Sequence, residues 1–373
     1  MNIGFDAKRL FTNFTGLGNY SRTLVRHYHE AFTEDKLFLF TPRITEDERT
    51  LPFINDPAYH NITPNGFRPL WRTLDVVKDI AENNIDVYHG LSHELPLGLS
   101  KLDIGKVVTI HDLIFKYYSD DHSWTDRKIY NWKWKHASAV ADIVIVISEQ
   151  TKNDLIKYYN VSPAKIRVIY QPADPVFSKF IDAYAVSTVR KKYNLPKAYN
   201  LYVGSVISRK NLLSILQAMT LLKPSERQPL VIIGNGKRYK SKVIETAKAG
   251  GIENLLIWLG KTSFEDFPAI YKGAQMMIYP SFHEGFGLPV IEAMHVGIPV
   301  ITSNQSSLKE AGGDAALLID PNQPAEIAEA MKLIATDNIL SKKMVDKGYQ
   351  HIAKFDHTKM ISQLRKVYED VRR

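Results

Sequence analysis

Two glutamates in the last third of the chain have a spacing that suits the binding of hydroxyl groups. Glu284 and Glu292 stand eight residues apart, with two glycines and Pro289 between them. A carboxylate accepts hydrogen bonds on both of its oxygens, so the pair could bind vicinal hydroxyls of a sugar ring and of a ribose. The spacing is equally compatible with an ordinary loop acid followed by a solvated helix glutamate.

The segment around these glutamates also has the features of a phosphate site. Proline is favoured in the first turn of a helix and glycine just after its end, so Pro289 and Gly297 predict a short helix from Pro289 to Val296. The N-terminus of a helix carries unpaired N–H groups and a partial positive charge, which favour a diphosphate. Gly285 and Gly287 would let the backbone approach it closely.

A second loop places two cations in a comparable position. Arg209 and Lys210 follow the apolar run Asn200–Val203 and precede a helical pattern. Arginine offers a planar fork and lysine a point charge for phosphate oxygens. By itself, such a pair at the start of a helix is more often a solvated surface pair.

Short apolar runs that alternate with helical patterning predict parallel sheets joined by crossover helices. A chain of 373 residues exceeds what one hydrophobic core usually serves, so we expect an α/β protein with two Rossmann-like domains facing one another across a cleft. Ligands of such sheets bind beyond the carboxyl ends of the strands, where both loops lie. The predicted strands include Ile3–Phe5, Leu37–Phe40, Val107–Ile110, Ile143–Ile147, Asn200–Val203, Leu230–Ile233, Leu255–Trp258, Met276–Tyr279 and Ile298–Ile301.

The longer segment that contains the glutamates resembles the signature of the retaining glycosyltransferases of family 4. It reads PSFHEGFGLP from Pro280, followed by Glu-Ala-Met from Glu292. The resemblance extends from Gly16 to the end of the chain and implies the GT-B fold. It also implies that Glu284 contacts the donor sugar and Glu292 the nucleotide ribose, and that the donor is lined by Gly285, Phe286, Gly287 and Leu288.

The basic loop resembles the family's arginine-lysine-asparagine loop, which holds the donor diphosphate. Gly204, Arg209 and Lys210 match it, whereas Ser205 stands where many members have an arginine. The resemblance implies that Arg209 and Lys210 stabilise the leaving diphosphate. A further loop, with Lys261, resembles the one that lies beside the nucleotide base.

In the first half of the chain, Gly16 and Gly18 resemble the family's first loop, whose glycines pack against the diphosphate. Ser21 stands where a dinucleotide fingerprint would need a third glycine, so a nicotinamide site is poorly supported, and a plain turn is the competing reading. His111 ends the run Val107–Ile110 and matches a family histidine near the donor sugar. A histidine satisfied by local backbone is equally compatible with its position.

Two prolines around Asp174 mark a linker. We therefore predict an N-terminal, acceptor-side domain over residues 1–172 and a donor-binding domain over residues 173–355. Residues 356–373 resemble the family's closing helix, which returns to the first domain. His357 stands where a tryptophan is common.

Composition narrows the remaining possibilities. The chain has 45% hydrophobic and 24% charged residues, a formal charge of +8 and no cysteine, so disulfides and thiolate metal sites are excluded. The N-terminus lacks the pattern of a secretory signal, and a cytoplasmic location is expected. Because no Asp-x-Asp triplet occurs, we expect neither a metal nor another cofactor.

The stretch from Trp124 to His136 is basic and aromatic with helical spacing. Such a face could lie on an anionic membrane as a peripheral contact, near lipid-linked acceptors. Tyr130 and Trp134 also have the spacing of residues that pack inward.

These observations predict a hexosyltransferase. It would move a sugar of the mannose type from a GDP or UDP donor to a hydroxyl of a sugar or lipid-linked acceptor, with the retention that the family implies, in surface polysaccharide or glycolipid synthesis. A sugar-nucleotide epimerase and a phosphorylase remain alternatives. A basic module for nucleic acid or lipid rests on charge alone, and no nucleic-acid motif supports it.

Overall fold

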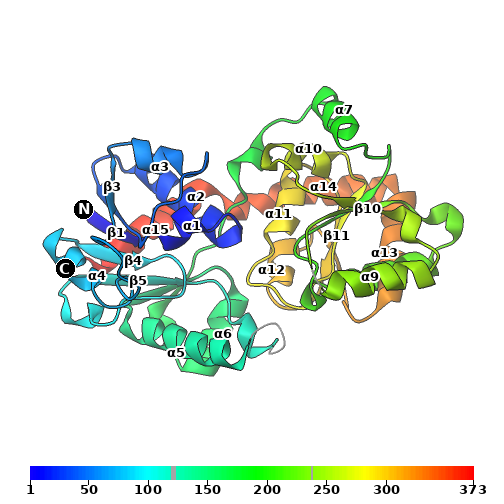
Figure 1. The fold of residues 1–373 in the computed structure, drawn as a ribbon. Coiled ribbons are helices and arrows are strands. Elements are labelled where there is room, and N and C mark those ends of the chain that lie inside the picture. Colours follow the sequence, from blue (N-terminus) through cyan, green and yellow to red (C-terminus); the bar gives the residue numbers. More distant parts are fainter. Residues whose placement is uncertain (119–122, 237) are drawn as a thin grey trace. The chain divides into compact units, whose positions relative to one another are not determined.

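Runs of buried apolar residues form the strands of two separate parallel sheets (Figure 1). The computed structural model describes residues 1–118, 123–236 and 238–373. Unit 1 comprises Met1–Gln171 and Asp356–Arg373, and unit 2 comprises Pro172–Phe355. Each sheet is parallel and connected by helices, which confirms the predicted α/β fold with two Rossmann-like domains.

The sheet of unit 1 has the strand order β3-β2-β1-β4-β5-β6-β7. Its strands are β1 (Asn2–Asp6), β2 (Lys36–Phe40), β3 (Tyr59–Ile62), β4 (Val87–Gly90), β5 (Gly105–Ile110), β6 (Ile143–Val146) and β7 (Ile166–Val168). The α-helices of this unit are α1 (Lys8–Thr12), α2 (Gly16–Ala31), α3 (Leu51–Asn55), α4 (Val76–Glu82), α5 (Trp124–Val140), α6 (Glu149–Tyr159) and α15 (His357–Val371).

The sheet of unit 2 has the order β10-β9-β8-β11-β12-β13. Its strands are β8 (Asn200–Val203), β9 (Leu230–Ile233), β10 (Leu256–Leu259), β11 (Met276–Tyr279), β12 (Val300–Ser303) and β13 (Leu317–Ile319). Its α-helices are α7 (Ala183–Lys192), α8 (Leu212–Leu221), α9 (Arg238–Ala249), α10 (Phe267–Lys272), α11 (Leu288–His295), α12 (Leu308–Gly312), α13 (Pro324–Thr336) and α14 (Asn338–Ile352).

Strand order reverses once in each sheet, and these reversals mark where a ligand can enter. In unit 1 the strands that follow β1 in the chain lie on one side of it, whereas the strands that follow β4 lie on the other side of β4. In unit 2 the strands that follow β8 and β11 diverge in the same way. Crossovers to opposite faces leave a crevice beyond the carboxyl ends of such a strand pair. The loops after β1, β4, β8 and β11 are therefore the ones that a ligand would meet.

The predicted elements agree with the structure to within a few residues. The short helix expected from Pro289 to Val296 is α11, Leu288–His295, and Gly297 follows it with φ of +71°. The strand expected at Ile298 begins at Val300, because Pro299 has no N–H to donate to a neighbouring strand.

A strand of unit 1 that the apolar pattern did not reveal is β4, whose sequence includes a histidine. His89 is fully buried, and its ring nitrogens lie 2.6 Å from the hydroxyl of Tyr368 and 2.8 Å from that of Thr109. Tyr368 belongs to α15, so this contact fastens the C-terminal helix to the sheet of unit 1. Arg365 of the same helix pairs with Asp35, whose carboxylate also binds the amino terminus of Met1.

Candidate active site

The loops after β8 and β11 meet at the reversal point of the second sheet. Ser208–Lys210 forms a single 3-10 turn after β8, and Asn211 follows in the left-handed conformation with φ of +58°. Its side-chain amide donates hydrogen bonds to the carbonyls of Pro280, at 3.1 Å, and Pro321, at 2.7 Å. Asn211 thus ties the basic loop to the loop that carries Glu284.

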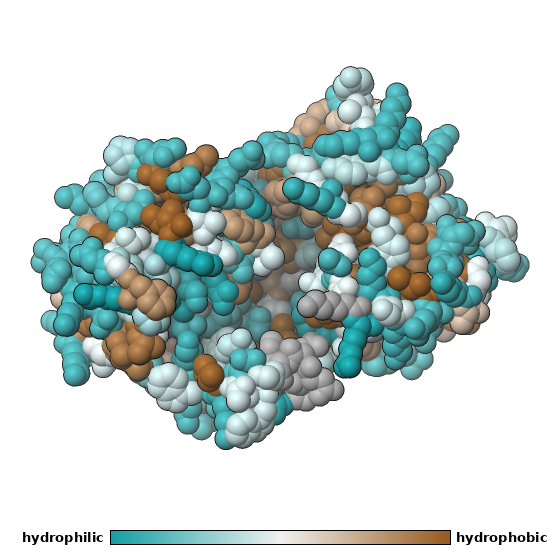
Figure 2. All heavy atoms as spheres, in the orientation of Figure 1, coloured by the Kyte–Doolittle hydropathy of each residue, from teal (hydrophilic) through white to brown (hydrophobic). Residues whose placement is uncertain are grey.

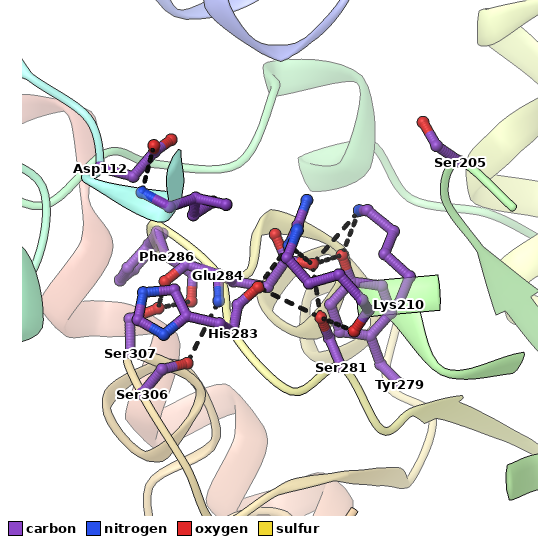
Figure 3. Close-up of polar contacts among 12 residues, drawn as sticks. Asp112, Ser205, Lys210, Tyr279, Ser281, His283, Glu284, Phe286, Ser306 and Ser307 are labelled. Carbon is purple, nitrogen blue, oxygen red and sulfur yellow. Dashed lines mark hydrogen bonds and ion pairs between the residues drawn. The ribbon is translucent and has the colours of Figure 1, made fainter. Parts of the chain in front are cut away.

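Four side chains converge on one oxygen of Glu284 (Figure 3). Tyr279 and Ser281 donate hydrogen bonds to Oε1 over 3.0 and 2.8 Å. Arg209 Nη1 and Lys210 Nζ lie 3.0 and 3.4 Å from the same oxygen. The structure therefore brings Glu284 together with Arg209 and Lys210, which the sequence had placed in a different loop.

The electrostatics of this cluster keep Glu284 ionised. Burial of the carboxyl group raises its pKa, but the charges of Lys210 and Arg209 and the hydrogen bond from Ser281 outweigh burial, and the pKa is about 2. His283, next in the chain, is buried near Arg209, and its pKa falls to about 4. At neutral pH the site holds an anionic carboxylate, two cations and a neutral imidazole.

The backbone of the glutamate loop is held by two serines. The N–H of Glu284 donates to Ser306 Oγ over 3.2 Å, and Ser307 Oγ donates to the carbonyls of Glu284 and Phe286 over 2.8 and 3.0 Å (Figure 3). Both serines belong to the turn between β12 and α12. The loop is thus pre-organised by hydrogen bonds from a third segment of the chain.

Two glycines of the site occupy positions that a side chain would disturb. Gly204 has φ of +147°, and a Cβ there would lie 3.0 Å from Lys210 Nζ. Gly287 has φ of +119°, and a Cβ there would lie 2.6 Å from Leu308. Glycine at both positions is required by backbone conformation and close packing.

Glu292 lies on α11 and has a different environment from Glu284. It is half-buried, and its Oε2 accepts a hydrogen bond of 2.7 Å from the hydroxyl of Tyr271, which lies in the core. Burial raises the pKa of Glu292 to about 7; Tyr271 and Lys210 lower it and the charge of Asp174 raises it. The two glutamates thus differ in ionisation although they share one motif.

The remaining donor-binding residues of unit 2 lie in different surroundings. The Phe286 ring is buried, and its centroid lies 5.2 Å from that of the Phe355 ring. The side chain of Phe286 therefore belongs to the core, and it is the backbone of this residue that a ligand would meet. Gly285 and Leu288 are half-buried, on either side of the left-handed Gly287. Lys261 is exposed in the loop after β10.

The predicted residues of unit 1 gather around the loops after β1 and β5. Gly16 and Gly18 open α2, whose Tyr20 packs its ring at 4.6 Å against that of His111. His111 Nε2 lies 2.9 Å from the carbonyl of Leu91, and burial lowers the pKa of His111 to about 4. His111 is therefore a neutral, backbone-anchored imidazole at the carboxyl end of β5.

Several residues of the site were not singled out in the sequence. Tyr279, Ser281, Ser306, Ser307 and Tyr271 all bond to a glutamate of the motif. Tyr279 and Ser281 stand at the end of a predicted strand, the position that usually meets a ligand, and that signal could have identified them. Tyr271 and the two serines come from helix and turn positions without a distinctive pattern.

Within the described ranges 1–118, 123–236 and 238–373, no three His, Asp or Glu side chains are grouped so that they could hold a metal ion. In the same residues, no helix has both the length and the apolar character needed to cross a membrane.

Comparisons with known families and proteins agree with the signature. The model described as "Glycosyltransferase Family 4" matches residues 14–177, and that described as "Glycosyl transferases group 1" matches residues 187–351. The chain is 30% identical over 347 residues to O-antigen chain mannosyltransferase B of Escherichia coli, over 86% of this chain and 87% of that protein. It is 26% identical to D-inositol 3-phosphate glycosyltransferase of Corynebacterium jeikeium, over 76% of this chain and 80% of that protein.

Solved structures share the fold at low sequence identity. Sucrose-phosphate synthase from Thermosynechococcus elongatus superposes with a TM-score of 0.78 at 22% identity, over 99% of this chain and 98% of that one. Anabaena HepE in complex with UDP and glucose superposes with a TM-score of 0.78 at 16% identity, over 99% and 100% of the two chains. The family and the fold that the Glu284 signature implied are confirmed: this chain belongs to glycosyltransferase family 4 and is a hexosyltransferase with the GT-B fold.

Proposed function

We propose that the protein transfers a hexose of the mannose type from a GDP or UDP donor to a hydroxyl of a sugar or lipid-linked acceptor, with retention, in surface polysaccharide or glycolipid synthesis. The observation that carries the donor half is the cluster on Glu284 Oε1, where a buried carboxylate and two cations meet. The mannose assignment is supported by the 30% identity to O-antigen chain mannosyltransferase B.

In this proposal the second oxygen of Glu284 binds the donor sugar. Oε1 already receives Tyr279, Ser281 and both cations, which fixes the orientation of the carboxylate before a ligand arrives. A pKa of about 2 keeps the group an acceptor of hydrogen bonds at every physiological pH. A sugar hydroxyl can then be held without reorganisation of the site, which lowers the cost of reaching the transition state.

Lys210 and Arg209 would stabilise the charge that develops on the leaving diphosphate. Lys210 Nζ is bonded to the Tyr279 hydroxyl over 2.5 Å and lies 3.4 Å from Glu284 Oε1, so the third of its donors is left to direct at phosphate oxygens. Arg209 is more deeply buried and donates to the carbonyl of His283, so we assign it a larger part in holding the loop. The cations of this mechanism are protein side chains, and no metal or other cofactor is invoked.

The other contacts follow the family's arrangement. We assign Glu292 to the ribose hydroxyls, Lys261 to the neighbourhood of the base, and the backbone of Gly285 and Gly287 to the phosphates. Gly16 and Gly18 would approach the diphosphate, and His111 would contact the transferred sugar as a neutral imidazole, in keeping with its pKa of about 4. Gly204 would leave room for Lys210, and Leu288 would line the donor.

We further propose that α5 makes a peripheral contact with the cytoplasmic face of an anionic membrane. The helix predicted from Trp124 to His136 is formed, and Trp134 is buried whereas Trp124, Ile129 and Trp132 are 50–61% exposed. Lys128 lies between the two exposed tryptophans at four-residue spacing, so cationic and apolar groups share one side. On the face drawn in Figure 2, hydrophobic residues in brown interrupt a mainly hydrophilic surface.

Substitution of Lys210 tests the donor half of the proposal. A charge-assisted hydrogen bond is worth roughly 1.5–3 kcal/mol, so Lys210→Ala should weaken nucleotide-sugar binding about tenfold or more and lower kcat about a hundredfold. Lys210→Arg should recover part of both losses. Binding and turnover are measured with UDP, GDP and ADP sugars, and the melting temperature shows which base is preferred.

The matched control is Lys248→Ala, which removes an exposed lysine of unit 2 that pairs with Glu253 and lies outside the site. Lys248→Ala should leave the affinity for nucleotide sugars and kcat unchanged. The donor assignment would be wrong if the unmodified protein responded to none of these nucleotide sugars, or if Lys210→Ala matched the control.

A further inference from the structure

A group of charged side chains that the donor site does not use gathers at the ends of β1 and β4, with Arg72 from the segment before α4 and Lys133 from α5. Asp6 ends β1, and Arg72 donates to both of its oxygens from Nε, at 3.1 Å, and from Nη2, at 2.6 Å. Arg72 Nη1 and Lys133 Nζ each lie 2.8 Å from Glu94, in the loop after β4. Two cations and two carboxylates therefore neutralise one another at the reversal point of the first sheet.

This four-residue network is closed. A cavity of about 10 Å³ beside it has room for about one water molecule. The Asp6 carboxylate is buried and Arg72 is 13% exposed, so the pairing orients the loops and leaves no charge free for a ligand.

Two further cations stand next to the network without a carboxylate of their own. Lys8 and Arg9 directly follow the buried Ala7 after β1, and both are half-buried. Across residues 1–118, 123–236 and 238–373, no acceptor lies within hydrogen-bond or ion-pair distance of Lys8 Nζ, and Arg9 Nε is buried without a partner. This part of unit 1 thus carries an excess of two positive charges.

Burial and neighbouring cations oppose the charge on Lys8, and Arg9 acts on nearby histidines. Burial lowers the pKa of Lys8 and the charge of Arg72 lowers it further, while the charges of Glu94 and Asp6 offset this only in part. The charge of Arg9 contributes to the lowered pKa of His93 and of His111. Both imidazoles are neutral, so they add no compensating or competing charge. A half-buried cation without a partner costs stability, and an anionic ligand removes that cost.

We propose that Lys8 and Arg9 bind a phosphate group of the acceptor, so that the acceptor is a phosphorylated glycoside and not a neutral one. This inference rests on the proposed function, in which a sugar is transferred to an acceptor. Crevices at strand reversals bind ligands, and the corresponding crevice of unit 2 is assigned to the donor. An arginine and a lysine together bind phosphate by a planar fork and a point charge. The phosphate can belong to a free sugar phosphate or to a lipid diphosphate.

The test compares acceptors that differ only in charge. Probes are an octyl glycoside, the same sugar as its 1-phosphate, and the same sugar as an octyl-linked 1-diphosphate. The unmodified protein should use and bind the phosphorylated sugars at least tenfold better than the octyl glycoside. A preference shared by both phosphorylated probes identifies a phosphate subsite, and a preference for the diphosphate alone identifies the lipid-linked form.

The measured quantity is kcat/KM for a phosphorylated sugar divided by kcat/KM for the octyl glycoside. The variant Lys8→Gln/Arg9→Gln should reduce this ratio at least tenfold. Lys8→Arg/Arg9→Lys keeps both charges and should retain the preference, and Lys101→Gln serves as an exposed lysine control of unit 1. Melting temperatures establish that each variant is folded. An unchanged ratio in the glutamine variant, or no preference in the unmodified protein, would overturn the proposal.

Binding of the 1-phosphate by calorimetry, without a nucleotide sugar, separates this inference from the proposed function. If the binding depends on Lys8 and Arg9 and survives Lys210→Ala, the phosphate subsite stands even if no nucleotide sugar is used. If sugar is transferred but binding and transfer are the same with and without the acceptor phosphate, the proposed function stands and the assignment of the phosphate subsite is wrong.

Discussion

Glu292 offers a prediction that links the structure to a pH profile. Its pKa is about 7, because burial on α11 opposes ionisation more than the Tyr271 hydrogen bond and the Lys210 charge favour it. If Glu292 receives two hydrogen bonds from the ribose hydroxyls, the donor binds the ionised form. With a pKa of about 7, about a tenth of the molecules are ionised at pH 6 and about nine tenths at pH 8. Donor affinity should therefore rise about tenfold between these values.

The assay is isothermal titration of GDP-mannose and UDP-glucose at pH 6, 7 and 8. Nucleotide sugars are preferable to free nucleoside diphosphates, because a terminal phosphate itself titrates near pH 6. His283 and His111, with pKa values of about 4, stay neutral throughout. Glu292→Gln should bind weakly and without this pH dependence. A flat profile in the unmodified protein, or the same slope in Glu292→Gln, would refute the assignment to the ribose.

The same shift has a consequence for stability, with a definite sign. A carboxyl group whose pKa is higher in the folded protein than in the unfolded chain favours folding at low pH. Its contribution is complete below pH 4.5 and is lost as the pH rises to about 7. The loss is at most about 3 kcal/mol. Calorimetry of the ligand-free protein should show Glu292→Gln gaining stability relative to the unmodified protein across this range.

Two other predictions concern single elements. A Cβ on Gly18 would lie 1.6 Å from the backbone oxygen of Asn13, so Gly18→Ala should lower the melting temperature through a loss of about 2–3 kcal/mol in the free energy of unfolding. A Cβ on Gly16 would have nothing within 4 Å, so Gly16→Ala should be nearly neutral. Equal effects of the two substitutions would contradict the packing argument. The double variant Ile129→Ser/Trp132→Ser should reduce partitioning onto phosphatidylglycerol vesicles at least tenfold. Phe180→Ser, which changes an exposed residue of unit 2, should leave partitioning unchanged. If the α5 substitutions do not change vesicle binding, α5 is not the membrane face.

The sequence by itself determined the elements and the family. Apolar periodicity predicted the strands to within a few residues, and Pro289 with Gly297 delimited α11, because backbone preference and amphipathicity act over short distances. The order of residues from Pro280 to Met294 was specific enough to identify family 4. His89 shows the limit of that reading, since a polar residue hid the strand β4 until its hydrogen bonds were visible.

Only the tertiary structure decided which side chains share an environment. Glu284 and Glu292 belong to one motif, yet Lys210 and Arg209, from the loop after β8, hold the pKa of Glu284 low, whereas burial raises the pKa of Glu292 against the hydrogen bond from Tyr271 of α10. Arg72 meets Asp6 across 66 positions of the chain, and burial together with the charge of Arg72 lowers the pKa of neighbouring Lys8. Strand order and packing bring such residues together, and local sequence carries no record of that proximity.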